Sequence, residues 1–269
     1  MIAGKTWREL RMMAVVYLLI LELLAVPIIL LWPDFYGDLQ KSSFFRNLPS
    51  FGRPIGEGIT NKNEQIAYTN WIALMLYFRS VNLAGIAASV LFGTALFARE
   101  REAQTFEFLL GRPVSRRHIL WAKFWPTALC VTVPIFLVNW SAILWSHHIE
   151  LDLSFGRITL ASLHGALFAL CFLSFTTWVS VFCRVQAHVA FWVGGVTIVQ
   201  IGIYLTQVIR TFSIFHLSDF EWYAPILLGN TPAWQMFDPV RSHGFTTYVI
   251  AATLLFYGLA WRALKRAEL

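Results

Sequence analysis

This sequence has few charged residues, few cysteines and no motif typical of a nucleotide site. Only 13% of its 269 residues are charged and 57% are hydrophobic, whereas an average soluble domain is about 25% charged. A soluble fold of this length could not bury so much apolar surface, but a bilayer can cover it. The composition therefore predicts an all-α integral membrane protein in which residues 1–269 form one domain.

The scarce reactive residues exclude several classes of site. Cys130, Cys171 and Cys183 lie in or at the ends of apolar stretches, so we expect packing residues and no disulfide framework. A Gly-x-x-x-x-Gly-Lys-[Ser/Thr] phosphate loop is missing, so the chain is not expected to hydrolyse ATP. The histidines lack metal-ligand spacing, and no nucleophile accompanies a base. We predict no catalytic residue, no metal and no cofactor of its own, and scattered basic residues argue against nucleic acid.

Six apolar stretches are present, each able to cross about 30 Å of hydrocarbon as a helix. The shortest is the last, whose true start could lie nearer His243. The predicted spans cover residues 12–32, 71–97, 119–145, 158–182, 189–208 and 246–261.

The basic residues are distributed unequally between the two sides of these spans. Thirteen of the 21 Lys and Arg residues fall on the side of the two termini, seven fall on the other side, and Arg79 lies within the second span. Cytoplasmic loops carry the excess of Lys and Arg. This asymmetry predicts a multi-pass protein of the cell membrane with both termini in the cytoplasm.

The segments outside the spans lead to three further expectations. The start, residues 5–11, mixes basic residues with a tryptophan and could lie along the inner membrane surface before the first span turns in. The segment 33–70 is rich in Gly, Pro, Ser and Asn and predicts an irregular loop. The aromatic-rich segment 209–245 suits short helices at the interface or dipping into the outer leaflet. These would be either an aromatic belt or an outer gate.

Glu22 and Arg79 fall well inside spans, where a charge is costly. Glu22 is expected to be protonated, hydrogen-bonded to a neighbouring span, or part of a translocation path. Arg79 lies nearer the membrane face opposite the two termini, and its side chain is expected to extend toward that surface. A direct pair between the two is not expected.

The loop between the second and third spans has the pattern of a docking element. Charged residues precede a mixed stretch, residues 102–110, which predicts a short amphipathic helix. Gly111 and Pro113 would end it, and Ser115 would cap the third span. A solvated connector with basic anchors is the alternative interpretation of this composition.

This loop resembles the inner loop of type-2 ABC exporter permeases, in which an acidic stretch leads to Gly-Thr, a Glu-Leu-Leu-like run, Pro-x-Ser-Arg and a downstream Lys. Gln104 stands where that family usually has Gly, a departure that could change the start of the helix. The matching residues are Glu100, Glu102, Thr105, Glu107, Leu109, Leu110, Pro113, Ser115, Arg116 and Lys123.

The resemblance implies a permease subunit that pairs with a second copy or a close relative and sits on a separate ABC ATPase, which would bind the ATP. The loop would be the coupling helix. The ATPase-coupling residues would be Glu100, Glu102, Thr105, Phe106, Glu107, Leu109, Leu110, Pro113, Ser115 and Arg116. The turn 183–188 would be a smaller contact. The alternatives to this permease are a permease-like subunit for sensing or assembly, or a polytopic membrane enzyme. Membrane lipid would surround the protein in each case. The sequence does not indicate the substrate.

Overall fold

The computed structural model describes residues 2–41, 52–106, 108, 111, 114–240 and 244–266. Every regular element in this part of the chain is a helix, as the composition predicted. Six helices are long and apolar enough to cross a membrane, which confirms the six predicted spans. They are Ala3–Leu30, Glu64–Glu102, Arg116–His148, Phe155–Phe182, Gln186–Leu205 and Phe245–Arg266.

Most of these helices extend beyond the apolar stretch that predicted them, because helical hydrogen bonding continues into polar sequence until a cap ends it. The third predicted span began at residue 119, whereas α7 (Arg116–His148) begins just after Ser115. The Ser115 hydroxyl accepts from the His118 N–H at 3.3 Å, which confirms the predicted cap.

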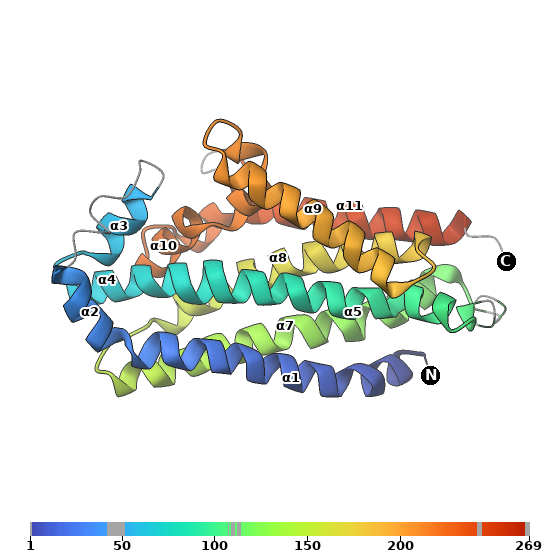
Figure 1. Ribbon diagram of the computed structural model, residues 1–269, viewed down its shortest axis with the longest axis horizontal. Coiled ribbons are helices and arrows are strands. Elements are labelled where there is room, and N and C mark those ends of the chain that lie inside the picture. Colours follow the sequence, from blue (N-terminus) through green and yellow to red (C-terminus); the bar gives the residue numbers. More distant parts are fainter. Residues whose placement is uncertain are drawn as a thin grey trace.

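The spans form an elongated bundle with α8 (Phe155–Phe182) near its centre. This helix packs against α5 (Asn82–Glu102), α7 and α11 (Phe245–Arg266), while α1 (Ile2–Leu30) packs mainly on α7. The fifth span, α9 (Gln186–Leu205), crosses the outside of the bundle against α5 and α8. Figure 1 places both termini, the α5–α7 connection and the α8–α9 turn at one end of the bundle, which we call the termini end.

A glycine sets the close approach of two central helices. A Cβ on Gly93 of α5 would lie 2.7 Å from Cγ2 of Thr176 on α8. Because Gly93 has no side chain, the α5 backbone can lie directly against the Thr176 side chain of α8, as small residues allow in membrane bundles.

The expectation of a separate interfacial segment before the first span was wrong. The first helix is continuous from Ile2 to Leu30, and nothing between Lys5 and Met12 breaks it. Lys5 and Glu9 are four residues apart and form an ion pair at 3.7 Å, the spacing that supports a helix.

The expectation of an irregular loop over residues 33–70 was also wrong for its described part. The chain forms α2 (Trp32–Lys41), α3 (Arg53–Ile59) and α4 (Glu64–Trp71). Asn63 caps α4 by accepting from the Ile66 N–H at 3.3 Å. Trp32 is fully buried and its ring lies 5.7 Å from that of Trp71. Aromatic packing thus orders a segment whose Gly and Pro content suggested a loop.

The aromatic-rich segment after α9 forms the short helices that its composition predicted. These are η3 (Arg210–Phe212), η4 (Ile214–Ser218), α10 (Phe220–Leu228) and η5 (Ala233–Phe237). They do not all lie at a lipid interface, because α10 packs against α8 and the first half of the second span. Tyr223 of α10 is fully buried inside the protein.

The second span contains an unusual helical stretch. Between α4 and α5 lies η2 (Ile72–Val81), ten residues of π-helix. The Ser80 hydroxyl donates to the carbonyl of Met75, five residues earlier, at 2.8 Å. This widened turn directs Tyr77 into the core while Arg79 is exposed. Such π-helical stretches often occur at functional sites.

Candidate coupling surface

The connection between α5 and α7 is held at the termini end by the ends of four helices. Phe106 is its apolar anchor and is only 7% exposed. A small hydrophobic cluster surrounds it, formed by Leu96, Phe97, Ile119, Leu120, Val181, Ala260 and Leu264. The base of the loop is therefore packed against α5, α7, α8 and α11.

Helix α5 ends in a Schellman-type turn, which the sequence did not predict. The Thr105 N–H donates to the Glu100 carbonyl at 2.8 Å, and the Gln104 N–H donates to the Arg101 carbonyl at 3.0 Å. Gln104 has a φ of 56°, the left-handed region that favours glycine. This conformation gives a physical reason for glycine at the corresponding position of the resembled family.

The predicted short helix over residues 102–110 cannot begin where we expected. Glu102 is the last residue of α5, and the chain turns at Ala103 and Gln104. Because a left-handed residue ends an α-helix, no single helix can run through this point.

Glu100 is paired inside the protein. Its carboxylate Oε1 lies 2.6 Å from the Lys123 Nζ of α7, and the same ammonium donates to the Leu96 carbonyl at 2.8 Å. The two side chains are 17% and 6% exposed, respectively. This pair joins the acidic stretch to the downstream lysine that the resemblance singled out, and we had not expected them to touch.

The two aromatic residues of the loop have opposite environments. Phe106 faces the ring of Phe97 edge-on at 6.4 Å, and the Arg101 guanidinium lies 4.5 Å from its ring centroid. Phe108, two residues later, is 78% exposed. Phe106 therefore anchors the loop, while Phe108 presents apolar surface outward; Phe108 was absent from our predicted contact residues.

Two other predicted residues, Glu102 and Arg116, tie the loop to neighbouring helices. The Glu102 carboxylate accepts from the backbone and the side-chain amide of Gln186, both at 3.3 Å, so the loop meets the start of α9. Arg116 donates to the Leu264 carbonyl at 3.0 Å. Thr105 is exposed and its hydroxyl lies 3.3 Å from the Glu100 carbonyl. Glu107, Leu109, Leu110 and Pro113 lie outside the described residues.

Glu22 is hydrogen-bonded to a neighbouring span, one of the alternatives open from sequence. The Ser141 hydroxyl of α7 donates to Glu22 Oε1 at 2.6 Å.

A buried polar network, which the sequence analysis missed, occupies the core near η2. Asn82 donates to the Ser218 carbonyl at 2.6 Å, and the Tyr223 hydroxyl donates to Asn82 Oδ1 at 3.0 Å. Burial raises the pKa of the Tyr223 phenol above its usual range, so the hydroxyl stays protonated and able to donate. The Tyr77 ring lies 5.1 Å from that of Tyr223, and the Tyr77 hydroxyl lies 3.2 Å from the Ser162 hydroxyl. Asn139 donates to the same Ser162 hydroxyl at 2.9 Å. Asparagines within apolar spans were the signal for this network.

Two further groups of polar contacts, around His164 and around Asp219, fasten the short helices that follow α9. His164 of α8 bridges the Leu217 carbonyl and the Thr246 hydroxyl, each at 2.9 Å. Arg210 pairs with Asp219 at 2.8 Å, and Asp219 caps α10 through the Trp222 N–H at 3.2 Å. These contacts hold α10 inside the bundle.

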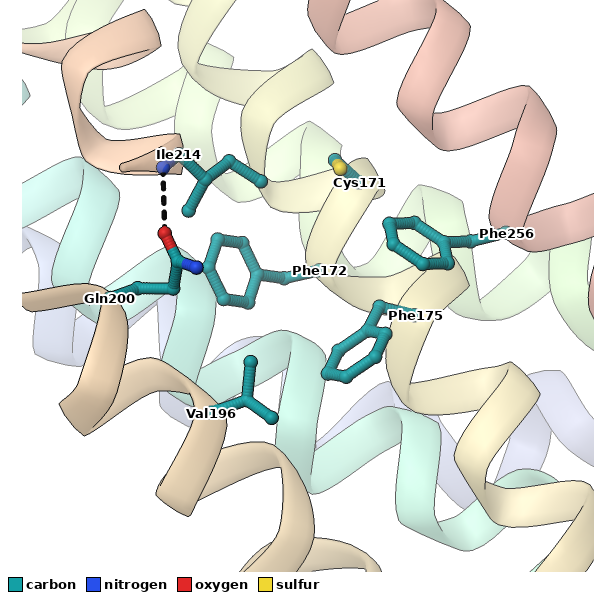
Figure 2. A pocket seen from close by; sticks show the side chains of 7 residues that line it. All are labelled: Cys171, Phe172, Phe175, Val196, Gln200, Ile214 and Phe256. Atoms are coloured by element: carbon teal, nitrogen blue, oxygen red, sulfur yellow. Dashed lines mark hydrogen bonds between the residues drawn. The ribbon is translucent and has the colours of Figure 1, made fainter. Parts of the chain in front are cut away.

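A small apolar hollow lies between α8, α9, α11 and η4 (Figure 2). Phe172, Phe175 and Phe256 turn toward it, and its volume is about 120 Å³. Gln200 is its polar wall residue, and Gln200 Oε1 accepts from the Ile214 N–H at 2.9 Å. The hollow therefore offers space for an apolar group and no reactive side chain apart from the thiol of Cys171.

The six candidate spans, the braced loop and the polar core define a polytopic helical membrane protein. A family model described as ABC-2 family transporter protein matches residues 2–264. The chain therefore belongs to the ABC-2 family of transporter membrane proteins. Members of this family are typically non-catalytic membrane subunits and generally pair with ABC ATPases. A search of curated proteins finds no match for the chain.

Proposed function

We propose that this chain is the membrane-spanning permease subunit of an ATP-driven exporter, seated at its termini end on a separate ABC ATPase. The observation that carries the proposal is the α5–α7 loop, which exposes Phe108 from a base fixed by four helix ends. An exposed apolar side chain on a rigid support is what a protein partner needs for a central contact. The family of the chain supports an ATPase as that partner.

The described loop residues divide into braces and contacts. Glu100 and Phe106 act as braces, because Lys123 and the surrounding cluster already engage them. Phe108, with the exposed residues Thr105 and Ser115, forms the contact surface. Motion of the ATPase would pass through the Glu100–Lys123 pair into α5 and α7 together.

The charge asymmetry of the sequence supports a cytoplasmic position for the termini end, where ATP is available. Exposed apolar residues along α1, α9 and α11 leave surfaces for lipid and for a second copy of the chain. The working unit in this proposal is two permeases on two ATPases.

Purification of the tagged chain from its native membrane in a mild membrane mimetic tests this proposal. Mass measurement of the intact particle should give two permeases with two ATPases. A particle that holds only one permease and one ATPase, or a permease dimer with no ATPase, contradicts it. Substrate-stimulated ATP hydrolysis by the particle distinguishes transport from a sensing or assembly role.

A further inference from the structure

A groove lined by three arginines opens at the termini end, between the ends of α8 and α11. Its volume is about 350 Å³. Arg101 from the end of α5, with Arg262 and Arg266 from α11, supplies the charge. The apolar lining residues are Trp178, Val181, Phe182, Leu259 and Ala263. The α11 residues recur at the spacing of one helical face.

The positive charge of this groove is not neutralised within the described part of the chain. The ion pairs within the described residues of the protein use other cations, and none involves Arg101, Arg262 or Arg266. Their cationic members are Lys5, Lys41, Lys123, His147, Arg210 and His216. The Arg101 Nε is buried and has no hydrogen-bond partner. Arg184, in the turn between α8 and α9, adds a positive charge that repels that of Arg101. Like charges gathered beside a low-dielectric surface favour a bound anion.

The apolar side of the groove continues toward the middle of the bundle. Trp178 lines the groove, and its ring stacks on Phe256 at 6.0 Å. Phe256 and Phe175 in turn line the hollow of Figure 2. Phe256 lies three residues before Leu259, and Phe175 lies three residues before Trp178; Leu259 and Trp178 both line the groove. The hollow and the groove therefore follow one another along α8 and α11.

We propose that this groove binds an anionic phospholipid of the adjacent leaflet. The headgroup phosphate lies among the three arginines, and one acyl chain follows α8 and α11 over the Trp178–Phe256 stack. Basic pockets between membrane-spanning helices recognise such headgroups. An acidic protein segment would match the charge, but it would not need an apolar path directed toward the centre of the membrane.

Arg101 connects this site to the α5–α7 loop. Its guanidinium lines the groove and also lies 4.5 Å from the Phe106 ring centroid. A bound phosphate would hold Arg101 in place over Phe106. Occupancy of the groove therefore steadies the base of the loop.

The test uses the purified full chain in detergent and native mass spectrometry. Dioleoyl phosphatidylglycerol is titrated against dioleoyl phosphatidylcholine, which has the same acyl chains and no net charge. The unaltered chain should prefer phosphatidylglycerol. The double variant Arg262→Gln, Arg266→Gln should bind it roughly 5- to 25-fold more weakly, because each basic residue near a bilayer surface contributes about a factor of five.

A matched control removes the same charge at the same end of the bundle. Arg8→Gln with Arg11→Gln changes two exposed arginines of α1 and should alter phosphatidylglycerol binding by less than about twofold. A second variant, Ala263→Trp, fills the groove without changing charge and should weaken binding as well.

Four results would overturn the proposal. Equal loss in the control variant would mean diffuse attraction, and equal binding of the two lipids would mean no headgroup recognition. Displacement of the lipid by millimolar inorganic phosphate would indicate a free-anion site. In a parallel purification from the native membrane, loss of the ATPase from the Arg262→Gln, Arg266→Gln variant, with unchanged lipid binding, would make the groove a protein-docking surface. Because lipid binding is measured without the ATPase, failure here is separate from failure of the proposed function.

Discussion

The ammonium of Lys123 on α7 lies 2.6 Å from the carboxylate of Glu100 on α5, and both side chains are largely shielded from water. These residues stand on either side of the α5–α7 loop, 23 positions apart. The pair therefore closes the base of the loop and makes the two helix ends one rigid support. Since a buried charge is costly without its partner, removing one member should be much worse than removing both.

The first prediction follows from that asymmetry. Lys123→Met should lower the free energy of unfolding by about 3 kcal/mol, because it leaves Glu100 unpaired and mostly buried. Adding Glu100→Gln should recover at least about 1 kcal/mol of this loss, because the unpaired charge is gone. Thermal unfolding of the four proteins of this double-mutant cycle in one detergent measures the coupling. Strictly additive effects would show that the two side chains do not interact.

A second prediction concerns the end of α5. Gln104→Gly should raise the free energy of unfolding by about 0.5–1 kcal/mol, because glycine relieves the strain of φ 56°. The neighbouring Ala103 has a φ of −81°, so Ala103→Gly should be neutral or destabilising and serves as the control. Stabilisation by Ala103→Gly to the same extent would remove the conformational explanation.

A third prediction tests the buried polar network. Tyr223→Phe removes the hydroxyl that donates to Asn82 Oδ1 at 3.0 Å and should cost about 1–2 kcal/mol of stability. Tyr248 is 47% exposed, so Tyr248→Phe should change stability by less than about 0.5 kcal/mol. Thermal unfolding of both variants gives the comparison. If the two substitutions have the same effect, the network does not support the core.

Sequence alone predicted the architecture because its signal is long and local. Twenty apolar residues in a row have few structural alternatives, and all six spans emerged from that rule. Segment 33–70 was mispredicted because packing of Trp32 on Trp71 depends on contacts between residues far apart in the chain. Gly and Pro within that segment indicated local flexibility, which the tertiary contacts outweighed.

The candidate site was only partly predictable for a related reason. The motif residues marked the correct loop, and Ser115 capped the helix as expected. Which side chains point inward could not be read from the motif, because Phe106 and Phe108 look equivalent in sequence. The left-handed turn at Gln104 and the hydrophobic cluster from four helices determine which side chain points inward. They bury Phe106 and leave Phe108 exposed.

The fourth prediction concerns orientation. In a background without the native cysteines, Lys62→Cys should react with an impermeant thiol reagent in intact cells. Arg117→Cys, exposed at the termini end, should react only after the membrane is opened. The reverse pattern would show that the charge asymmetry has been interpreted with the wrong sign.

Docking of an ATPase on the α5–α7 loop is the central claim, and one comparison tests it most directly. Phe108 and Phe212 are each 78% exposed, but Phe212 belongs to η3, which follows the end of α9 that lies away from the α8–α9 turn. Phe108→Ala should reduce the ATPase recovered with the tagged chain by at least about fivefold, because truncating a central aromatic contact costs more than about 1 kcal/mol. Phe212→Ala should leave recovery unchanged. Equal recovery of the ATPase with both variants and the unaltered chain would contradict the claim that this loop is the coupling surface.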